Sequence, residues 1–208
     1  MSASKSIAVV VSSTRTPRVG PNVAAFVQET VLPNASSANL TLQTVDVASF
    51  NLPVYNEAVI PAMVPEKASF AYPHSIAWSA EMKQHSAFIF VVPEYNFGMA
   101  AATKNAIDYL YNELVGKPVL IVSYGILGGT NASAQVKTVL TGMKMKVVET
   151  RPALSFTGGN GPDLYKAMGE GVLGEDTRKA WEGEKVEELR KAFEELKREL
   201  EEGEVKKD

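Results

Sequence analysis

The feature that most constrains the fold of this chain is the repeated alternation of short apolar runs with segments of helical periodicity. Residues 7–11, 87–92 and 118–123 are rich in β-branched and other apolar residues, as expected of strands buried on both faces of a sheet. Weaker strand patterns cover residues 40–47 and 147–154. Helical spacing separates the strands, and this alternation predicts βαβ units that form a doubly wound parallel sheet.

Composition excludes several classes of protein. Hydrophobic residues make up 45% of the 208 residues and charged residues 22%, which is typical of a globular chain. The sequence has no cysteine, which excludes a disulfide framework, a thiolate metal site and a catalytic thiol. No apolar stretch is long enough for a secretory signal or a membrane span, so we expect no membrane partner and a cytoplasmic location.

The chain divides by charge into a body, residues 1–174, and a tail, residues 175–208. Of the 24 acidic and 21 basic residues, 13 and 9 lie in the tail, which leaves a body of charge +1. A nearly neutral body does not indicate a nucleic-acid partner. The residue pattern over 175–202 predicts a charged amphipathic helix. Its apolar positions are spaced as two heptads: Val186, Leu189, Phe193, Leu196 and Leu200. This face is too short for an independent coiled coil, and we expect it to pack on the domain or on a second subunit.

The first of three candidate ligand loops follows the first strand, at residues 12–22. It offers hydroxyl groups and two arginines at the start of a helix, where backbone N–H groups and the helix dipole attract an anion. The loop lacks both GxGxxG and GxxxxGK[ST], so dinucleotide and Walker-type binding are not indicated. A single terminal phosphate suits it. An ordinary polar surface loop that caps the helix is an equally good interpretation of this segment taken alone.

The other two loops follow the third and fourth strands, at residues 93–98 and 123–129. The first contains aromatic and amide side chains, and the second contains glycines that leave its backbone exposed. Ligands of open α/β sheets bind beyond the carboxyl ends of the strands. A planar ring with several heteroatoms could therefore rest between these two loops.

These segments resemble one known family. Ser13-x-Arg15, the block from Pro93 to Asn96 with its continuation at residues 104–108, and the glycine loop are similar to the NADPH-dependent FMN reductase family, and most of all to its fungal NAD(P)H:quinone reductase-like branch. The resemblance covers residues 5–160. It implies a flavodoxin-like α/β fold, with a doubly wound five-stranded parallel sheet in the order 2-1-3-4-5 and helices on both faces. It also implies FMN as the cofactor, NADPH or NADH as the electron donor, and a homodimer or homotetramer.

The resemblance also assigns the binding residues. Those that would hold the FMN phosphate are Ser13, Arg15, Arg18, Asn22 and the amide of Val23. Those that would line the edge of the isoalloxazine ring are Pro93, Glu94, Tyr95, Asn96 and Phe97. Those that would close its other side are Ser123, Tyr124, Gly125 and Gly128. We expect no catalytic side chain and no metal ligand, because the cofactor supplies the reactivity.

The implied activity is an FMN-dependent NAD(P)H oxidoreductase that passes electrons to quinones or similar small acceptors. Nicotinamide would deliver a hydride to flavin N5, and donor and acceptor would alternate in a ping-pong cycle. Two other interpretations stay open: a flavodoxin-like electron carrier, and a regulatory protein whose binding depends on the flavin state. The nearly neutral body argues against the carrier, since carriers tend to be strongly acidic.

Overall fold

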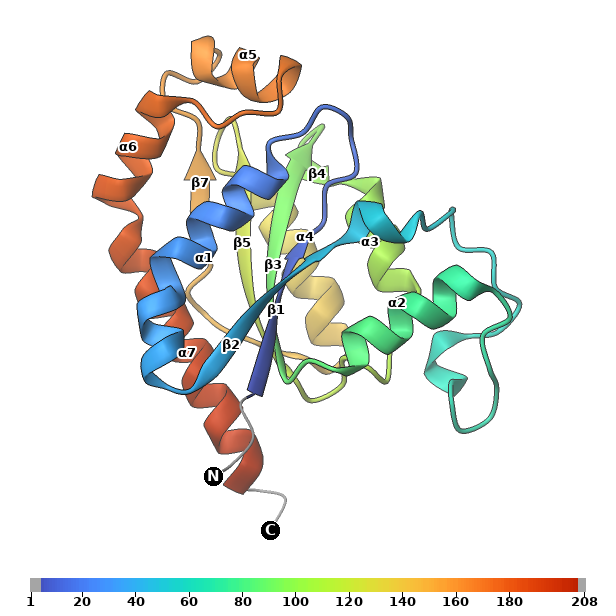
Figure 1. Ribbon diagram of the computed structural model, residues 1–208. Helices are drawn as coiled ribbons and strands as arrows, with labels where there is room; N and C mark the ends of the chain where they lie inside the picture. Colours follow the sequence, from blue (N-terminus) through green and yellow to red (C-terminus); the bar gives the residue numbers. More distant parts are fainter. Residues whose placement is uncertain (1–4, 206–208) are drawn as a thin grey trace.

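The computed structural model describes residues 5–205 and has a seven-stranded sheet at its centre. The strands are β1 (Lys5–Val11), β2 (Leu40–Asp46), β3 (Ala87–Tyr95), β4 (Gly98–Met99), β5 (Pro118–Gly125), β6 (Lys146–Val147) and β7 (Ala153–Ser155). Their main order is β2-β1-β3-β5-β6, all parallel, with β4 antiparallel to β3 and β7 parallel to β5 (Figure 1). This order confirms the predicted flavodoxin-like sheet.

The strands differ from the prediction in two places. The expected fifth strand, residues 147–154, is interrupted, and its two ends, β6 and β7, both pair with β5. Pro152 lies in the interruption and has no N–H to donate to a ladder. The third strand does not stop at Pro93, which pairs with Tyr124 in the parallel ladder, but continues into a hairpin with β4.

Helices cover both faces of the sheet, as predicted (Figure 1). On one face lie α1 (Gly20–Ser37), α6 (Glu175–Glu184) and α7 (Val186–Val205), and on the other lie α2 (Pro73–Lys83), α3 (Ala101–Asp108) and α4 (Thr130–Gly142). The short helix α5 (Pro162–Gly169) lies beyond the carboxyl ends of the strands (Figure 1). None of the helices in the described part of the chain is long and apolar enough to span a membrane.

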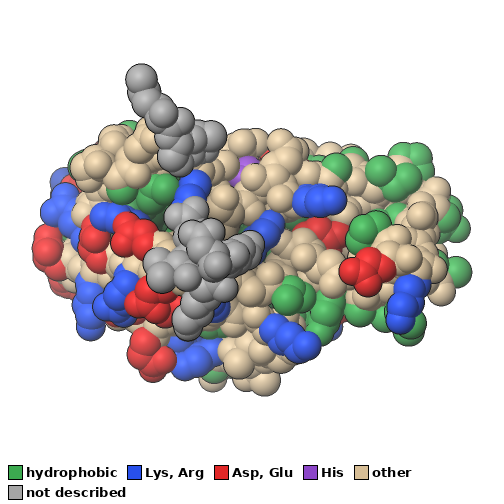
Figure 2. All heavy atoms as spheres, turned by 90° about the horizontal axis from the view of Figure 1, so that it is seen from below, with side chains coloured by type: hydrophobic (Ala, Val, Ile, Leu, Met, Phe, Trp, Pro, Cys, Tyr) green, Lys and Arg blue, Asp and Glu red, His purple; other side chains and the backbone are tan. Residues whose placement is uncertain are grey.

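The tail forms two helices rather than one, with the break at Lys185. Leu189, Phe193 and Leu196 of α7 are fully buried in the hydrophobic core that also contains α1. Trp181 of α6 packs against this core too, and its indole N–H donates to the Ser155 carbonyl. The apolar face of the tail therefore packs on the chain's own domain. Acidic and basic side chains mix on the outer surface on this side (Figure 2).

The chain between β2 and α2 forms a long irregular excursion with two short 3-10 helices, η1 (Val47–Phe50) and η2 (Pro61–Met63). The buried carboxylate of Glu57 organises it by accepting hydrogen bonds from the amides of Ala71 and Tyr72. Burial would raise the pKa of Glu57, but these hydrogen bonds outweigh it and lower the pKa. Apolar side chains are exposed at this end of the molecule, opposite the charged helices (Figure 2).

Candidate functional site

A pocket of about 510 Å³ lies at the carboxyl ends of β1, β3 and β5. Six of the residues assigned from the sequence line it: Arg15, Glu94, Tyr95, Asn96, Tyr124 and Gly125. They come from all three candidate loops. The parallel sheet brings these loops together because the carboxyl ends of β1, β3 and β5 meet at one edge.

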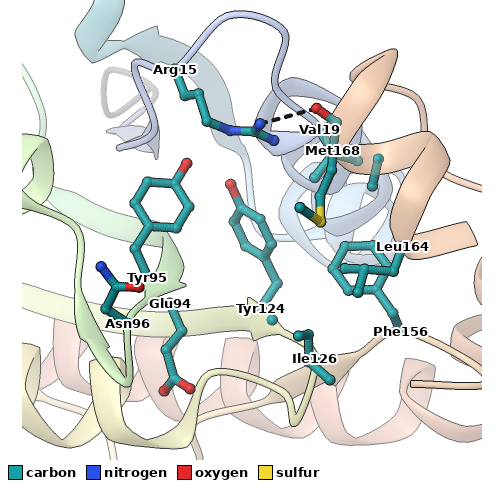
Figure 3. A pocket seen from close by; sticks show the side chains of 12 residues that line it. Arg15, Val19, Glu94, Tyr95, Asn96, Tyr124, Ile126, Phe156, Leu164 and Met168 are labelled. Carbon is teal, nitrogen blue, oxygen red and sulfur yellow. Dashed lines mark hydrogen bonds between the residues drawn. The ribbon is translucent and has the colours of Figure 1, made fainter. Parts of the chain in front are cut away.

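The end of the pocket near α1 suits an anion. Arg15 points into this end, and the hydroxyl groups of Tyr95 and Tyr124 point toward it (Figure 3). The side chain of Ser13 is fully buried beside the start of α1. Its Oγ atom has no hydrogen-bond partner within the described part of the chain. A buried hydroxyl without a partner costs free energy unless a ligand satisfies it.

Gly20, the first residue of α1, makes room for this hydroxyl. A Cβ atom on Gly20 would lie 2.1 Å from Ser13 Oγ and 2.9 Å from the Tyr124 hydroxyl oxygen. Burial raises the pKa of Tyr124 above its ordinary value, and the Ser13 hydroxyl and the nearby arginine charges lower it only in part. Both hydroxyls are therefore neutral donors at physiological pH. The residues at this end fit the phosphate group of FMN.

Three of the residues assigned to the phosphate have other partners. The Arg18 guanidinium pairs with the Asp46 carboxylate and donates to the Ser13 carbonyl. The Asn22 side-chain amide donates to the Gly171 carbonyl. The Val23 amide donates to the carbonyl of Val19, the residue before α1, and the Val23 side chain is fully buried. Arg18 and Asn22 thus shape the loop, and Val23 belongs to the core.

The segment after β3 is a tight hairpin whose two turn residues, Asn96 and Phe97, have positive φ angles of 49° and 61°. Glu94 anchors it, because one carboxylate oxygen accepts hydrogen bonds from two amides at the start of α4, those of Asn131 and Ala132. The Glu94 carboxylate points away from the pocket (Figure 3). Phe97 is 77% exposed and does not line the pocket, and Pro93 is buried in the strand.

The glycine loop after β5 is held by its own side chains. Ser123 is buried, and its hydroxyl donates to the Gly128 carbonyl. Gly128 has a φ angle of +80° and lies against Ala153, so any side chain there would collide with β7. Ser123 and Gly128 therefore set the shape of the loop, while Gly125 faces the pocket.

Sequence reasoning missed the apolar wall of the pocket. Its residues are Val19, Ile126, Phe156, Leu164, Ala167 and Met168. Half of them lie on α5, which covers the pocket from the side opposite Tyr95 (Figure 3). Arg15 Nη1 donates to the Met168 carbonyl at 3.0 Å and ties α5 to the first loop. The signal was the helical spacing of apolar residues after Pro162, but the same spacing also suits an ordinary core helix.

No group of three or more histidine or carboxylate side chains within the described residues could hold a metal ion. The donors that converge on the pocket are instead hydroxyls, a guanidinium and backbone groups. This donor set suits a phosphate joined to a flat organic group.

Comparison with known proteins agrees with this geometry. The profile of the NADPH-dependent FMN reductase family matches residues 6–158. The NAD(P)H-dependent FMN reductase ntnL from a Nectria species is 48% identical over 193 residues, which cover 92% of this chain and 94% of that protein. The chain belongs to the NADPH-dependent FMN reductase family. Membership confirms the predicted oxidoreductase class and the predicted use of FMN and NAD(P)H.

Two further proteins are similar to this chain, one in sequence and one in structure. A quinone reductase from Pseudomonas putida is 30% identical over 188 residues, which cover 86% of this chain and 89% of that protein. The structure of FerB, an NAD(P)H:(acceptor) oxidoreductase from Paracoccus denitrificans, superposes with a TM-score of 0.61 at 20% identity, covering 92% of this chain and 98% of that one. The second comparison shows that the fold is shared.

Proposed function

We propose that this FMN reductase passes electrons from NADPH or NADH to quinones or similar small acceptors in a ping-pong cycle. The observation that carries the proposal is that one end of the pocket has both Arg15 in its lining and the buried Ser13 hydroxyl, which has no partner in the described part of the chain, beside the start of α1. The loops after β3 and β5 border the rest of the pocket. The names of the Pseudomonas putida and Paracoccus denitrificans relatives support a small-molecule acceptor.

Each part of the pocket has a role in this proposal. Ser13 and Arg15 bind the phosphate, while Tyr95, Asn96 and the Gly125 backbone border the ring. The apolar side chains of α5 exclude water from one side of the pocket. FMN, when bound, supplies the chemistry by accepting a hydride from nicotinamide and delivering electrons to the acceptor. Donor and acceptor would take turns at the same pocket mouth, which is the basis for the ping-pong order.

An absorbance experiment under anaerobic conditions tests the function. The purified protein, supplied with FMN, is expected to show flavin absorbance that bleaches on addition of NADPH or NADH and returns on addition of a quinone. Initial rates at several fixed quinone concentrations are expected to give parallel double-reciprocal lines. Protein that does not bind FMN would refute the proposal, and protein that bleaches but is not reoxidised by quinones would refute the acceptor class.

The proposal includes assembly as a homodimer or homotetramer in the cytoplasm. Three apolar side chains next in sequence to pocket residues are strongly exposed: Phe97 at 77%, Leu127 at 73% and Tyr165 at 62%. A second subunit over the pocket mouth would remove these side chains from water. Light scattering of the purified protein is expected to give at least twice the mass of one chain, and a monomer at micromolar concentration would refute this part.

A further inference from the structure

The side chain of Tyr124 extends away from the glycine loop that follows it, toward another part of the pocket (Figure 3). The resemblance assigns this residue to the isoalloxazine side of the site, together with the glycine loop. In the structure Tyr124 is near the end of β5, its ring is buried, and its hydroxyl points toward the end of the pocket that contains Arg15 (Figure 3).

Ser13, Gly20 and the hydroxyl group of Tyr124, which come from three different elements, lie close together at that end of the pocket. The position of a Cβ on Gly20 would be 2.9 Å from the Tyr124 hydroxyl oxygen and 2.1 Å from Ser13 Oγ. Both hydroxyls therefore lie beside the first residue of α1, where the positive end of the helix dipole favours an anion. The charges of Arg15 and Arg18 also act on the Tyr124 phenol, which places it within the same positive field.

We propose that the Tyr124 hydroxyl binds the phosphate of FMN together with Ser13, and that this pair makes the site select FMN over riboflavin, which lacks the phosphate. The inference rests on the proposed flavin site and adds a specificity residue to it. A ligand without the phosphate leaves the buried Ser13 hydroxyl oxygen without a partner and gives the Tyr124 hydroxyl no charged acceptor, and both effects favour FMN. Burial keeps the Tyr124 phenol protonated, so it can donate to a phosphate oxygen.

The variant Tyr124→Phe tests the proposal because it removes one oxygen and keeps the ring. The full chain, stripped of flavin, is titrated with FMN and separately with riboflavin, and binding is followed by flavin fluorescence. The Kd for FMN is expected to rise by about 10- to 100-fold, as for a lost hydrogen bond to a charged group, while the Kd for riboflavin stays within about twofold. Tyr72→Phe, at a 43% exposed position in the excursion between β2 and α2 and outside the pocket, is the matched control and is expected to change neither value.

Each outcome decides a different point. Equal weakening of FMN and riboflavin would place Tyr124 against the ring and overturn the inference, and so would unchanged binding of both. A wild-type protein that binds the two flavins equally well would also overturn it while leaving the flavin site intact. Failure of the wild type to bind either flavin would refute the proposed function itself. Gly20→Ala, whose Cβ would crowd the hydroxyl oxygens of both Ser13 and Tyr124, is the second variant if Y124F does not fold. A selective loss of FMN binding is expected for it, and an equal loss for riboflavin would overturn the inference.

Discussion

Replacing Gly20 by alanine is expected to damage phosphate binding while leaving the protein folded. The added Cβ would lie 2.1 Å from Ser13 Oγ, which is more than 1 Å closer than an ordinary van der Waals contact. The Ser13 hydroxyl can relieve this overlap by rotating, but it then points away from the anion end of the pocket. The φ angle of Gly20 is not in the left-handed region, so the helical backbone accepts alanine there.

The expected magnitude follows from the group that is displaced. A hydrogen bond to a charged group contributes about 1.5–3 kcal/mol, so the Kd for FMN is expected to rise by about 10- to 100-fold. Alanine in place of glycine in a helix contributes up to about 1 kcal/mol, which offsets the crowding. The free energy of unfolding of the flavin-free protein is therefore expected to change by no more than about 1 kcal/mol.

A double-mutant cycle with Ser13→Ala is the appropriate assay. Flavin fluorescence gives the Kd of FMN and of riboflavin for the wild type, G20A, S13A and the double variant, and urea unfolding gives their stabilities. Because S13A removes the more crowded of the two oxygens, G20A is expected to cost several-fold less FMN affinity in that background than in the wild type. Additive losses, or an equal loss for riboflavin, would contradict the reasoning.

Two further predictions concern stability. Phe193→Ala, in the buried face of the tail, is expected to lower the free energy of unfolding by about 3–5 kcal/mol in urea titrations. Leu32→Ala, the control at a half-exposed site, is expected to lower it by less than about 1 kcal/mol. Equal effects would mean that the tail is not part of the core. Glu57→Gln is expected to cost about 1–3 kcal/mol at pH 7. The folded pKa of Glu57 is lowered, so its contribution is present above the unfolded pKa and is lost as pH falls through the folded pKa. The stability gap between wild type and E57Q should therefore close in acid, and a gap that does not depend on pH would contradict this account.

The strands that build the sheet could be predicted because the apolar residues within each strand indicate its burial without reference to other segments. A strand buried on both faces needs a run of apolar residues whatever its neighbours are, and residues 87–92 show this pattern without reference to the rest of the chain. The break between β6 and β7 was missed. The register against β5 changes there, since Val147 pairs with Val119 but Ala153 pairs with Ser123, and residue spacing does not report a register between distant strands.

The tail illustrates the same division. Its heptad spacing correctly indicated that one face is apolar and buried, but spacing is silent about the partner. The structure places Phe193 in the core of its own domain, since α7 lies along α1 there. A face of this kind packs equally well on a neighbouring element or on another chain, so only the tertiary arrangement distinguishes them.

By itself, the sequence determined the parallel sheet, the three loops at its carboxyl edge and the residue types that suit a phosphate and a flat ring. Only the tertiary structure decided which of those residues face the pocket. Arg18 is drawn away by Asp46, 28 residues further along the chain, and α5 contributes an apolar wall whose residues look like any core helix. The hydroxyls of Ser13 and Tyr124 lie together beside Gly20 although β1 and β5 are far apart in the chain. The physical reason is that a ligand site depends on distances between segments, whereas sequence patterns report only the burial and conformation of each segment.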